Sequence, residues 1–159
     1  MQRITPMLWF DGHAEEAANF YVSVFKKNSK VKEITHYAGE EFPEKKGQVM
    51  TVSFELNGQE FVALNGGPDF KFTEAVSFVI NCDTQEEIDY YWEKLTADGG
   101  EELECGWVAD KYGLFWQVTP AKFLDEWVKD PAGLQRVTHE VWQMKKLDLA
   151  TLEKAFAGK

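Results

Sequence analysis

The sequence predicts an α+β fold in which a β-α-β-β-β module occurs twice and a helical extension follows. Glu15-Glu16 and Glu86-Glu87 lie 86 − 15 = 71 residues apart, and each pair follows an apolar run and precedes aromatic positions at matching spacing. Asn57-Gly58, between two alternating runs, is typical of a tight hairpin. After Pro120 the alternation gives way to helical spacing. Such a repeat indicates two copies of one supersecondary unit.

The first module is expected over residues 1–68. Its opening strand contains Pro6, which favours a sheet edge or a bulge. Apolar residues then recur at helical spacing from Ala14 to Phe25, with Glu15 and Glu16 in the first turn. The expected elements are a strand at 4–10, a helix at 14–25, a strand at 31–37, a polar loop at 40–46, and hairpin strands at 49–56 and 60–64.

The second module is expected over residues 69–119, so that residues 1–119 form one domain with two halves. Gly99-Gly100 closes its helix, and Pro120 ends its last strand. Residues 120–159 form a helical extension, in which Asp148 is a plausible N-cap for the last helix. The expected elements are a strand at 75–81, a helix at 85–97, strands at 102–109 and 114–119, and extension helices at 123–129, 134–145 and 149–156.

The composition of the chain argues against nucleic acid and membranes as binding partners. The formal net charge of −10 over 159 residues disfavours binding to nucleic acid. No apolar run approaches the roughly 18 residues of a membrane helix, and the N-terminal segment is unlike a signal peptide. Two cysteines, Cys82 and Cys105, are too few for a disulfide framework. We therefore expect a cytoplasmic protein that binds neither nucleic acid nor membrane.

The chain resembles the vicinal oxygen chelate superfamily, which includes glyoxalase I, bleomycin-resistance proteins and extradiol dioxygenases. Three stretches carry the resemblance: residues 8–12 running into Phe20-Tyr21, the hairpin at residues 57–61, and residues 110–118. Residues 63–68, 89–95 and 105–107 resemble more narrowly its PhnB-like group, which is often labelled 3-demethylubiquinone-9 3-methyltransferase-like. The resemblance implies two modules that form a cupped, partly open barrel, and a homodimer.

In the metal enzymes of that superfamily, the ion is held by side chains on the inner strands of both modules. The resemblance places these positions on Pro6, Val62 or Ala63, Ser77 and Gln117. Proline and valine cannot ligate an ion, and a hydroxyl and an amide are weak neutral donors. None of the three histidines, His13, His36 and His139, pairs with another at ligand spacing. We therefore expect no metal and no other cofactor.

No catalytic residue is evident, and whether the protein is an enzyme stays open. Cys105 lacks a histidine near it in sequence, and a buried structural role is the more frequent state of such a cysteine. A Rossmann-like methyltransferase needs a glycine-rich turn between a strand and a helix. Gly66-Gly67 is followed by Pro68 and Gly99-Gly100 closes a helix, so neither fits that motif.

A ligand pocket remains as the candidate site. Aromatic residues on predicted strands, with a few neutral polar groups, suit a small and partly flat apolar molecule. Val62 and Gln117 are expected to point into the cup. Phe61 and Trp116 precede them directly on the same strands and therefore point to the opposite face, so they are expected in the core. The candidate pocket residues are Trp9, Val62, Asn65, Ser77, Cys105, Trp107 and Gln117.

Three functions are compatible with these residues. The first is a metal-free small-molecule-binding protein. The second is an enzyme of the same superfamily, such as a lyase, a dioxygenase or a methyltransferase, with a metal recruited through Gln117 or an unrecognised site. The third is a dimeric interaction module without a ligand. The sequence identifies neither the ligand nor which chain the helical extension covers.

Overall fold

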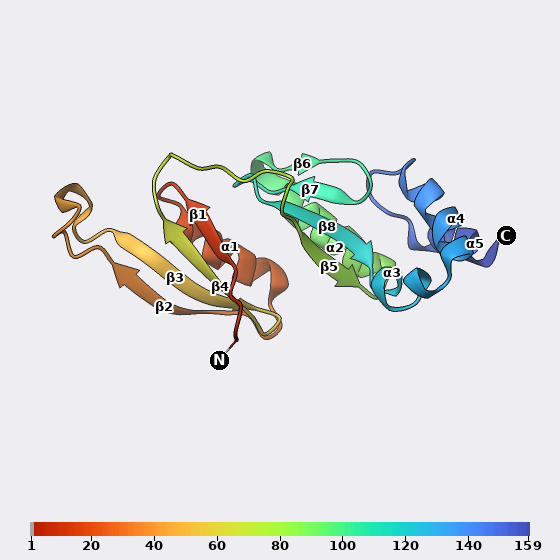
Figure 1. Ribbon diagram of the computed structural model, residues 1–159, viewed down its shortest axis with the longest axis horizontal. Helices are drawn as coiled ribbons and strands as arrows, with labels where there is room; N and C mark the ends of the chain where they lie inside the picture. The colour runs from red at the N-terminus through yellow and green to blue at the C-terminus, as the bar shows by residue number, and fades with distance from the viewer. Residues whose placement is uncertain (1) are drawn as a thin grey trace. The chain divides into compact units, whose positions relative to one another are not determined.

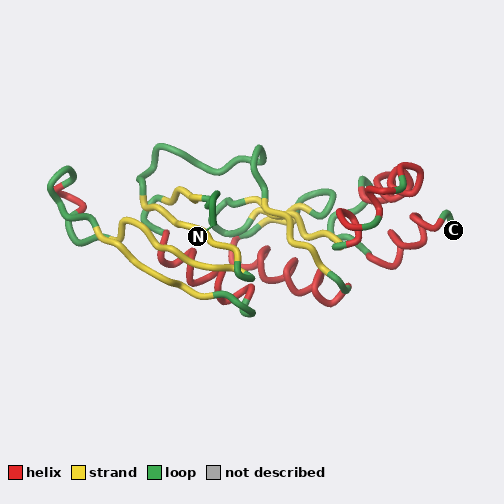
Figure 2. Tube along the Cα trace, turned by 60° about the horizontal axis from the view of Figure 1, so that its bottom comes forward, coloured by secondary structure: helices red, strands yellow, loops and turns green. Residues whose placement is uncertain are grey.

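The computed structural model describes residues 2–159 and divides into two compact units, residues up to Lys71 and residues from Phe72 onward (Figure 1). Each unit holds one four-stranded sheet with a helix against one face, as Figure 2 shows in yellow and red. Unit 1 contains β1 (Met7–Phe10), α1 (Ala14–Phe25), β2 (Lys30–His36), β3 (Val49–Leu56) and β4 (Gln59–Asn65), with a short 3-10 turn at Pro43–Lys45.

Unit 2 repeats this order and adds the helical extension. Its elements are β5 (Phe78–Cys82), α2 (Gln85–Thr96), β6 (Glu101–Glu102), β7 (Trp107–Ala109), β8 (Phe115–Pro120), α3 (Lys122–Asp125), α4 (Pro131–Val141) and α5 (Leu149–Ala157), with 3-10 turns at Ala97–Gly99 and Trp127–Lys129. The strand orders are β1-β4-β3-β2 and β5-β8-β7-β6. In the first sheet β1 runs parallel to its neighbour β4, and in the second β5 runs parallel to its neighbour β8. This shared topology confirms the α+β fold with two β-α-β-β-β modules and C-terminal helices.

The core of unit 1 lies between α1 and the sheet. Small residues of α1 are fully buried and let the helix approach the strands, while Tyr21 fills the remaining space. The Tyr21 ring stacks on Phe54 with centroids 6.3 Å apart, and Phe54 stacks on Phe61 at 5.5 Å. The hairpin turn after β3 has φ +50° at Asn57 and +81° at Gly58, which confirms the expected turn.

In unit 2, α2 buries Ile88, Trp92 and Leu95 against its sheet. The α2 N-terminus is capped by Thr84, whose side chain accepts a hydrogen bond from the Glu87 N–H. The apolar helix positions therefore repeat at the expected interval of 71 residues. Trp116, only 2% exposed, lies in the core as expected, and so does Phe61 in unit 1.

The strands repeat at a different interval, which corrects one part of the alignment. Met7 pairs with Val62 as Val79 pairs with Gln117, an interval of 79 − 7 = 72 residues. The connection from strand to helix is one residue shorter in unit 2, so the helix interval cannot be carried over to the strands. Pro6 and Ser77 are therefore not equivalent positions, and the counterpart of Ser77 is Thr5, since 77 − 72 = 5.

The strand expected at residues 102–109 is also corrected, because it is two short strands. Cys105 and Gly106 between them have φ of +60° and +80°. Their N–H groups leave the sheet and donate to the carbonyl oxygens of Met144 and Lys145, each at 2.8 Å. A Cβ at Gly106 would lie 3.0 Å from Leu147, so both the backbone and the space favour glycine there. The extension thus replaces the sheet as the hydrogen-bonding partner.

The helical extension packs on unit 2 of its own chain. Gln85 on α2 binds it twice, donating to the Leu147 carbonyl at 3.1 Å and accepting from the Leu149 N–H at 2.7 Å. Asp148 caps α5 as expected, accepting from the Thr151 N–H at 2.8 Å. The extension helices differ in extent from the prediction, since α3 is a single short turn and α4 begins at Pro131. The helices of the extension and the segments that connect them form one apolar cluster: Trp127, Val137, Val141, Leu147 and Leu152.

The helices of residues 2–159 are all shorter or more polar than a segment that could cross a bilayer.

Candidate functional site

A cavity of about 270 Å³ lies in unit 2 between the open face of the sheet and the helical extension. The sheet side carries three of the expected pocket residues, Cys105, Trp107 and Gln117. The extension supplies the opposite wall. None of the lining residues carries a formal charge: they are Val79, Cys105, Trp107, Gln117, Thr119, Phe123, Leu124, Thr138, Val141, Trp142 and Leu147.

The alternation of β8 explains which of its residues reach the cavity. Trp116 and Val118 are buried on the α2 side, so Gln117 and Thr119 project from the opposite face. Val79 of β5 lies beside Gln117 in the parallel pair and is 42% exposed on that same face. The sheet therefore presents the Gln117 amide within a largely apolar wall, whereas the Thr119 Oγ1 is itself buried.

Gln117 is held in place by Ser77. The Gln117 Nε2 donates to the Ser77 Oγ at 3.0 Å. With its amide nitrogen engaged, the Gln117 Oε1 makes no hydrogen bond to any other residue of the described chain. The sequence placed both residues in the site, and the structure joins them: Ser77 positions the side chain and Gln117 presents an acceptor.

Thr119 was missed by the sequence reasoning. It is 9% exposed, and its Oγ1 is buried without a hydrogen-bond partner among residues 2–159. Buried hydroxyl groups in folded proteins are almost always hydrogen-bonded, so this one is exceptional. Its parity with Gln117 was the available signal, because residues two apart on a strand share a face.

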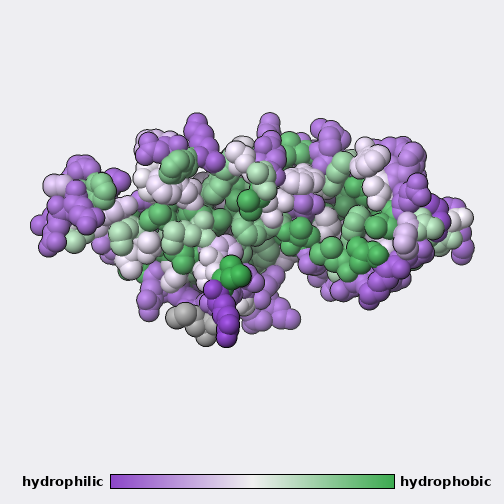
Figure 3. All heavy atoms as spheres, in the orientation of Figure 1, coloured by the Kyte–Doolittle hydropathy of each residue, from purple (hydrophilic) through white to green (hydrophobic). Residues whose placement is uncertain are grey.

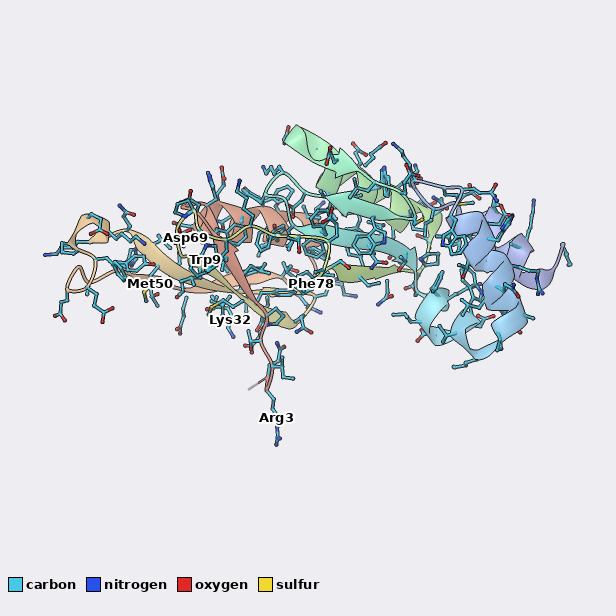
Figure 4. The ribbon with its side chains drawn as sticks, turned by 45° about the horizontal axis from the view of Figure 1, so that its top comes forward. Arg3, Trp9, Lys32, Met50, Asp69 and Phe78 are labelled. Atoms are coloured by element: carbon cyan, nitrogen blue, oxygen red, sulfur yellow. The ribbon has the colours of Figure 1, made fainter. Side chains whose placement is uncertain are left out.

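The expected pocket residues of unit 1 are not part of this cavity, and two of them have structural partners. The Trp9 Nε1 donates to the Gly67 carbonyl at 2.8 Å, and its ring meets Phe70 edge-on at 4.8 Å. Figure 4 shows Trp9 beneath the loop that carries Asp69. A Cβ at Gly66 would lie 2.3 Å from the Trp9 ring, so this loop is fitted closely to the indole.

Asn65 ends β4 and connects three segments of unit 1. Its Oδ1 accepts from the Ala14 N–H at 2.9 Å, which caps α1 from a distant strand. Its Nδ2 donates to the Val49 carbonyl at 3.1 Å, and its own carbonyl accepts from the Tyr37 hydroxyl at 2.6 Å. Val62 is half-buried on the sheet face that α1 does not cover.

Asp110 stabilises the turn between β7 and β8. It is 3% exposed, and its Oδ1 accepts from the Tyr112 and Leu114 N–H groups at 2.8 and 3.1 Å. Its Oδ2 accepts from the Trp116 Nε1 at 2.8 Å. The carboxylate thus fixes the start of β8 and, through it, the direction in which Gln117 and Thr119 point.

Comparison with known proteins identifies the family. The family model described as 3-demethylubiquinone-9 3-methyltransferase matches residues 2–119. The chain belongs to this family. A PhnB protein from Bacillus cereus, described by the same name, is 42% identical over 76% of this chain and 100% of its own, with a TM-score of 0.67. The expected PhnB-like resemblance is therefore confirmed.

More distant structures share the fold of this 3-demethylubiquinone-9 3-methyltransferase family. A protein from Pseudomonas aeruginosa is 18% identical over 73% of this chain and 95% of its own, with a TM-score of 0.60. A fosfomycin resistance protein from Listeria monocytogenes is 15% identical over 78% of this chain and 94% of its own, with a TM-score of 0.54. The comparison with curated proteins gave no match.

The cavity does not fit the cofactor that the family's description implies. S-adenosylmethionine carries an ammonium, a carboxylate and a sulfonium, and no lining side chain has a charge to pair with any of them. Both strand-to-helix turns are closed by the chain's own side chains: Asn65 accepts from the first residue of α1, and Glu87 accepts from the Asp83 N–H at 2.6 Å. We therefore derive no methyl-transfer step.

The residues that the structure describes also hold no group of three His, Cys, Asp or Glu side chains placed to bind an ion. The polar atoms at the cavity are an amide and hydroxyl groups, together with the Cys105 thiol. Such neutral oxygens do not fit a transition metal, which requires about three imidazole, thiolate or carboxylate ligands.

The two free cysteines should differ sharply in reactivity. Burial, reinforced by the Glu87 and Asp83 carboxylates, raises the pKa of Cys82 to about 12. A raised pKa keeps the thiol protonated, so the reactive thiolate is scarce at about pH 8, and its population grows only as the pH rises. Iodoacetamide should therefore modify Cys105 at least about tenfold faster than Cys82. Peptide mass spectrometry would measure both rates, and equal rates would contradict this assignment.

Proposed function

We propose that this protein binds a small, largely apolar molecule in the unit 2 cavity, without a metal. The observation that carries the proposal is the cavity itself, with aromatic and aliphatic walls and a few converging neutral polar groups. An apolar cavity of about 150 Å³ is large enough for benzene, so about 270 Å³ accommodates a two-ring compound.

The walls suit a flat molecule. Trp107 is half-buried on β7, and Trp142, which is 71% exposed, lies on the extension at the end of α4. Phe123 adds a third ring from α3. Indole and benzene rings offer large, rigid contact surfaces at a low entropic cost. Binding rather than chemistry is the conclusion, because the polar groups beside these rings include neither an activated nucleophile nor a general base.

Filling the cavity tests this function. Thr138 lines the cavity from α4 and is half-buried, so Thr138→Phe should occupy part of the volume. Ala132→Phe, on an exposed position of the same helix, is the matched control. Unbiased mass spectrometry of natively purified protein should find a small molecule with the parent and the Ala132 variant, and much less with the Thr138 variant. Equal yields from all three proteins, or none from any, would overturn the proposal.

The metal-free part of the proposal has its own measurement. Protein purified without chelator should carry less than about one equivalent of zinc, nickel, iron or manganese per two chains, because one amide oxygen cannot hold such an ion. Elemental analysis of the parent and of Gln117→Ala gives the comparison. Stoichiometric metal that disappears in the variant would favour the alternative function, an enzyme with a recruited metal.

The proposed assembly is a homodimer. Two large apolar side chains of the extension, outside the Trp142 position, are exposed: Leu124 at 56% and Val128 at 43%. Figure 3 shows apolar side chains at the surface of unit 2 near β5 and α3. A two-fold symmetric pair uses the same patch twice, so one such surface suffices. Analytical ultracentrifugation at micromolar concentration should give about twice the 18.3 kDa chain mass. A monomer throughout that range would contradict this assembly.

The proposed location is the cytoplasm. It rests on Cys82 and Cys105, which are both free thiols, as is usual in a reducing compartment.

A further inference from the structure

The exposure of the lining residues locates the mouth of the unit 2 cavity. Leu147 and Val141 are 1% and 8% exposed and belong to its buried wall. Val79, Leu124 and Trp142 also line the cavity, but they are 42%, 56% and 71% exposed. A side chain that lines a cavity and is still widely exposed lies where the cavity opens to solvent. The mouth is therefore framed by β5, α3 and the end of α4, and these side chains make its rim apolar.

The Trp142 indole is held by few contacts. Its Nε1 donates no hydrogen bond, and its ring stacks on no other ring, within residues 2–159. The Trp127 ring, by contrast, packs on two aromatic neighbours, and the Trp92 and Trp116 N–H groups donate to carboxylates. An exposed side chain without such restraints changes rotamer within picoseconds to nanoseconds. The Trp142 ring is therefore free to turn.

The backbone leaves this ring two principal positions. Trp142 directly follows α4 and has helical φ and ψ of −63° and −16°. A helical backbone disfavours the χ1 rotamer near +60°, and the two remaining rotamers differ by about 120°. Besides the cavity, the ring lines a groove of about 400 Å³ along one face of α4. The groove residues share the helical spacing of that face: Pro131, Leu134, Gln135, Thr138, His139 and Trp142.

The two hollows lie on either side of the same side chains. Trp142 and Thr138 line both the cavity and the groove, so they form the boundary between them. A ligand in the cavity presents a flat apolar surface at the mouth, on which an indole packs favourably. Such packing also removes the apolar rim from water. Because only a filled cavity offers this surface, ligand binding favours the position of the ring over the mouth.

We propose that Trp142 is a lid, which turns from the groove over the mouth of the cavity and packs on the bound molecule. The inference rests on the proposed function and adds how the site retains its ligand. Because the ring closes after the ligand has entered, it slows the escape of the ligand and not its arrival. Val79 and Leu124 form the remaining rim against which the lid closes.

Stopped-flow fluorescence with 2-naphthol, a neutral two-ring fluorophore, measures both rates on the full chain. Trp142→Ala should raise the dissociation rate constant about tenfold and change the association rate constant less than about twofold, so the dissociation constant rises about tenfold. Trp142→Phe should restore most of the slow dissociation, because a benzene ring still packs on the ligand. Val128→Ala, at an exposed apolar position of the extension outside the cavity lining, is the matched control and should leave both rates unchanged.

Relaxation of the indole ¹⁵N–H groups gives a second measurement, which a merely structural role of Trp142 would not change. The order parameter of the Trp142 N–H should lie below about 0.6 in the free protein and rise toward about 0.85 when 2-naphthol saturates the site. Trp127 is 1% exposed and serves as the internal reference, which should be rigid in both states.

The outcomes separate the lid from the cavity on which it rests. Three results would each overturn the lid and leave the binding cavity in place: unchanged dissociation from Trp142→Ala, association that accelerates as much as dissociation, or a Trp142 order parameter that stays the same on binding. Absence of 2-naphthol binding to the parent, or binding that persists unchanged in Thr138→Phe, would overturn the proposed function and the lid with it.

Discussion

Trp127→Ala is expected to lower the free energy of unfolding of unit 2 by about 3–5 kcal/mol and to weaken ligand binding. Trp127 is 1% exposed at the centre of the apolar cluster of the extension. Its ring lies 6.0 Å from Phe123 and 5.7 Å from Phe156, centroid to centroid. The loss of the indole leaves a void beneath Phe123 and Val141, which are also walls of the ligand cavity.

Trp142→Ala is the control within the same segment. Trp142 is 71% exposed, so its loss removes little buried area and should change the unfolding free energy by less than about 1 kcal/mol. Denaturant titration monitored by circular dichroism compares the two variants. Similar midpoints for Trp127→Ala and the parent would mean that the extension does not pack on unit 2 as described.

Tyr21→Ala and Trp92→Ala are each expected to lower the free energy of unfolding by about 3–5 kcal/mol, because each removes a buried ring and leaves a cavity. The two residues occupy equivalent places in the two modules. Tyr21 is fully buried and Trp92 is 5% exposed, and each lies at the centre of the only long helix of its module within the described chain. The Trp92 Nε1 also donates to the Glu102 carboxylate at 2.8 Å, so its removal also takes away a side-chain hydrogen bond to the edge strand β6.

The comparison variant is Phe42→Ala. Phe42 is 45% exposed in a loop of unit 1, and its truncation should cost about 1 kcal/mol or less. If either helix variant unfolded at the denaturant concentration of the parent, the two helices would not hold equivalent core positions.

Local chemistry made much of the fold predictable. Asn57-Gly58 specifies a turn with positive φ at both positions, and the structure has it. Side chains alternate between the two faces along β4 and β8, which correctly distinguished the buried Phe61 and Trp116 from Val62 and Gln117 on the opposite face. The break at Cys105 and Gly106 escaped prediction, because its cause is a long-range backbone pairing with Met144 and Lys145.

The site was predictable only on the sheet side. Cys105, Trp107 and Gln117 were among the residues expected to line a pocket, Trp107 as an aromatic residue on a predicted strand and Gln117 from the family resemblance. No local pattern reveals which surface a helical extension covers. The wall made by Phe123, Thr138 and Trp142 is therefore visible only in three dimensions. Asn65 was predicted to line the pocket, but it caps a helix instead. Its partner, the Ala14 N–H, is 51 residues away, so no local sequence pattern reveals this role.

The indole N–H signals of the six tryptophans test the central claim most directly. Two of these residues, Trp107 and Trp142, line the cavity, whereas Trp9, Trp92, Trp116 and Trp127 do not. In a ¹⁵N-labelled protein titrated with 2-naphthol, with signals assigned by single Trp→Phe variants, the Trp107 and Trp142 signals should shift saturably and the Trp9 and Trp92 signals should stay in place. A titration that moves the Trp9 signal and leaves Trp107 and Trp142 unchanged would contradict a ligand site in the unit 2 cavity.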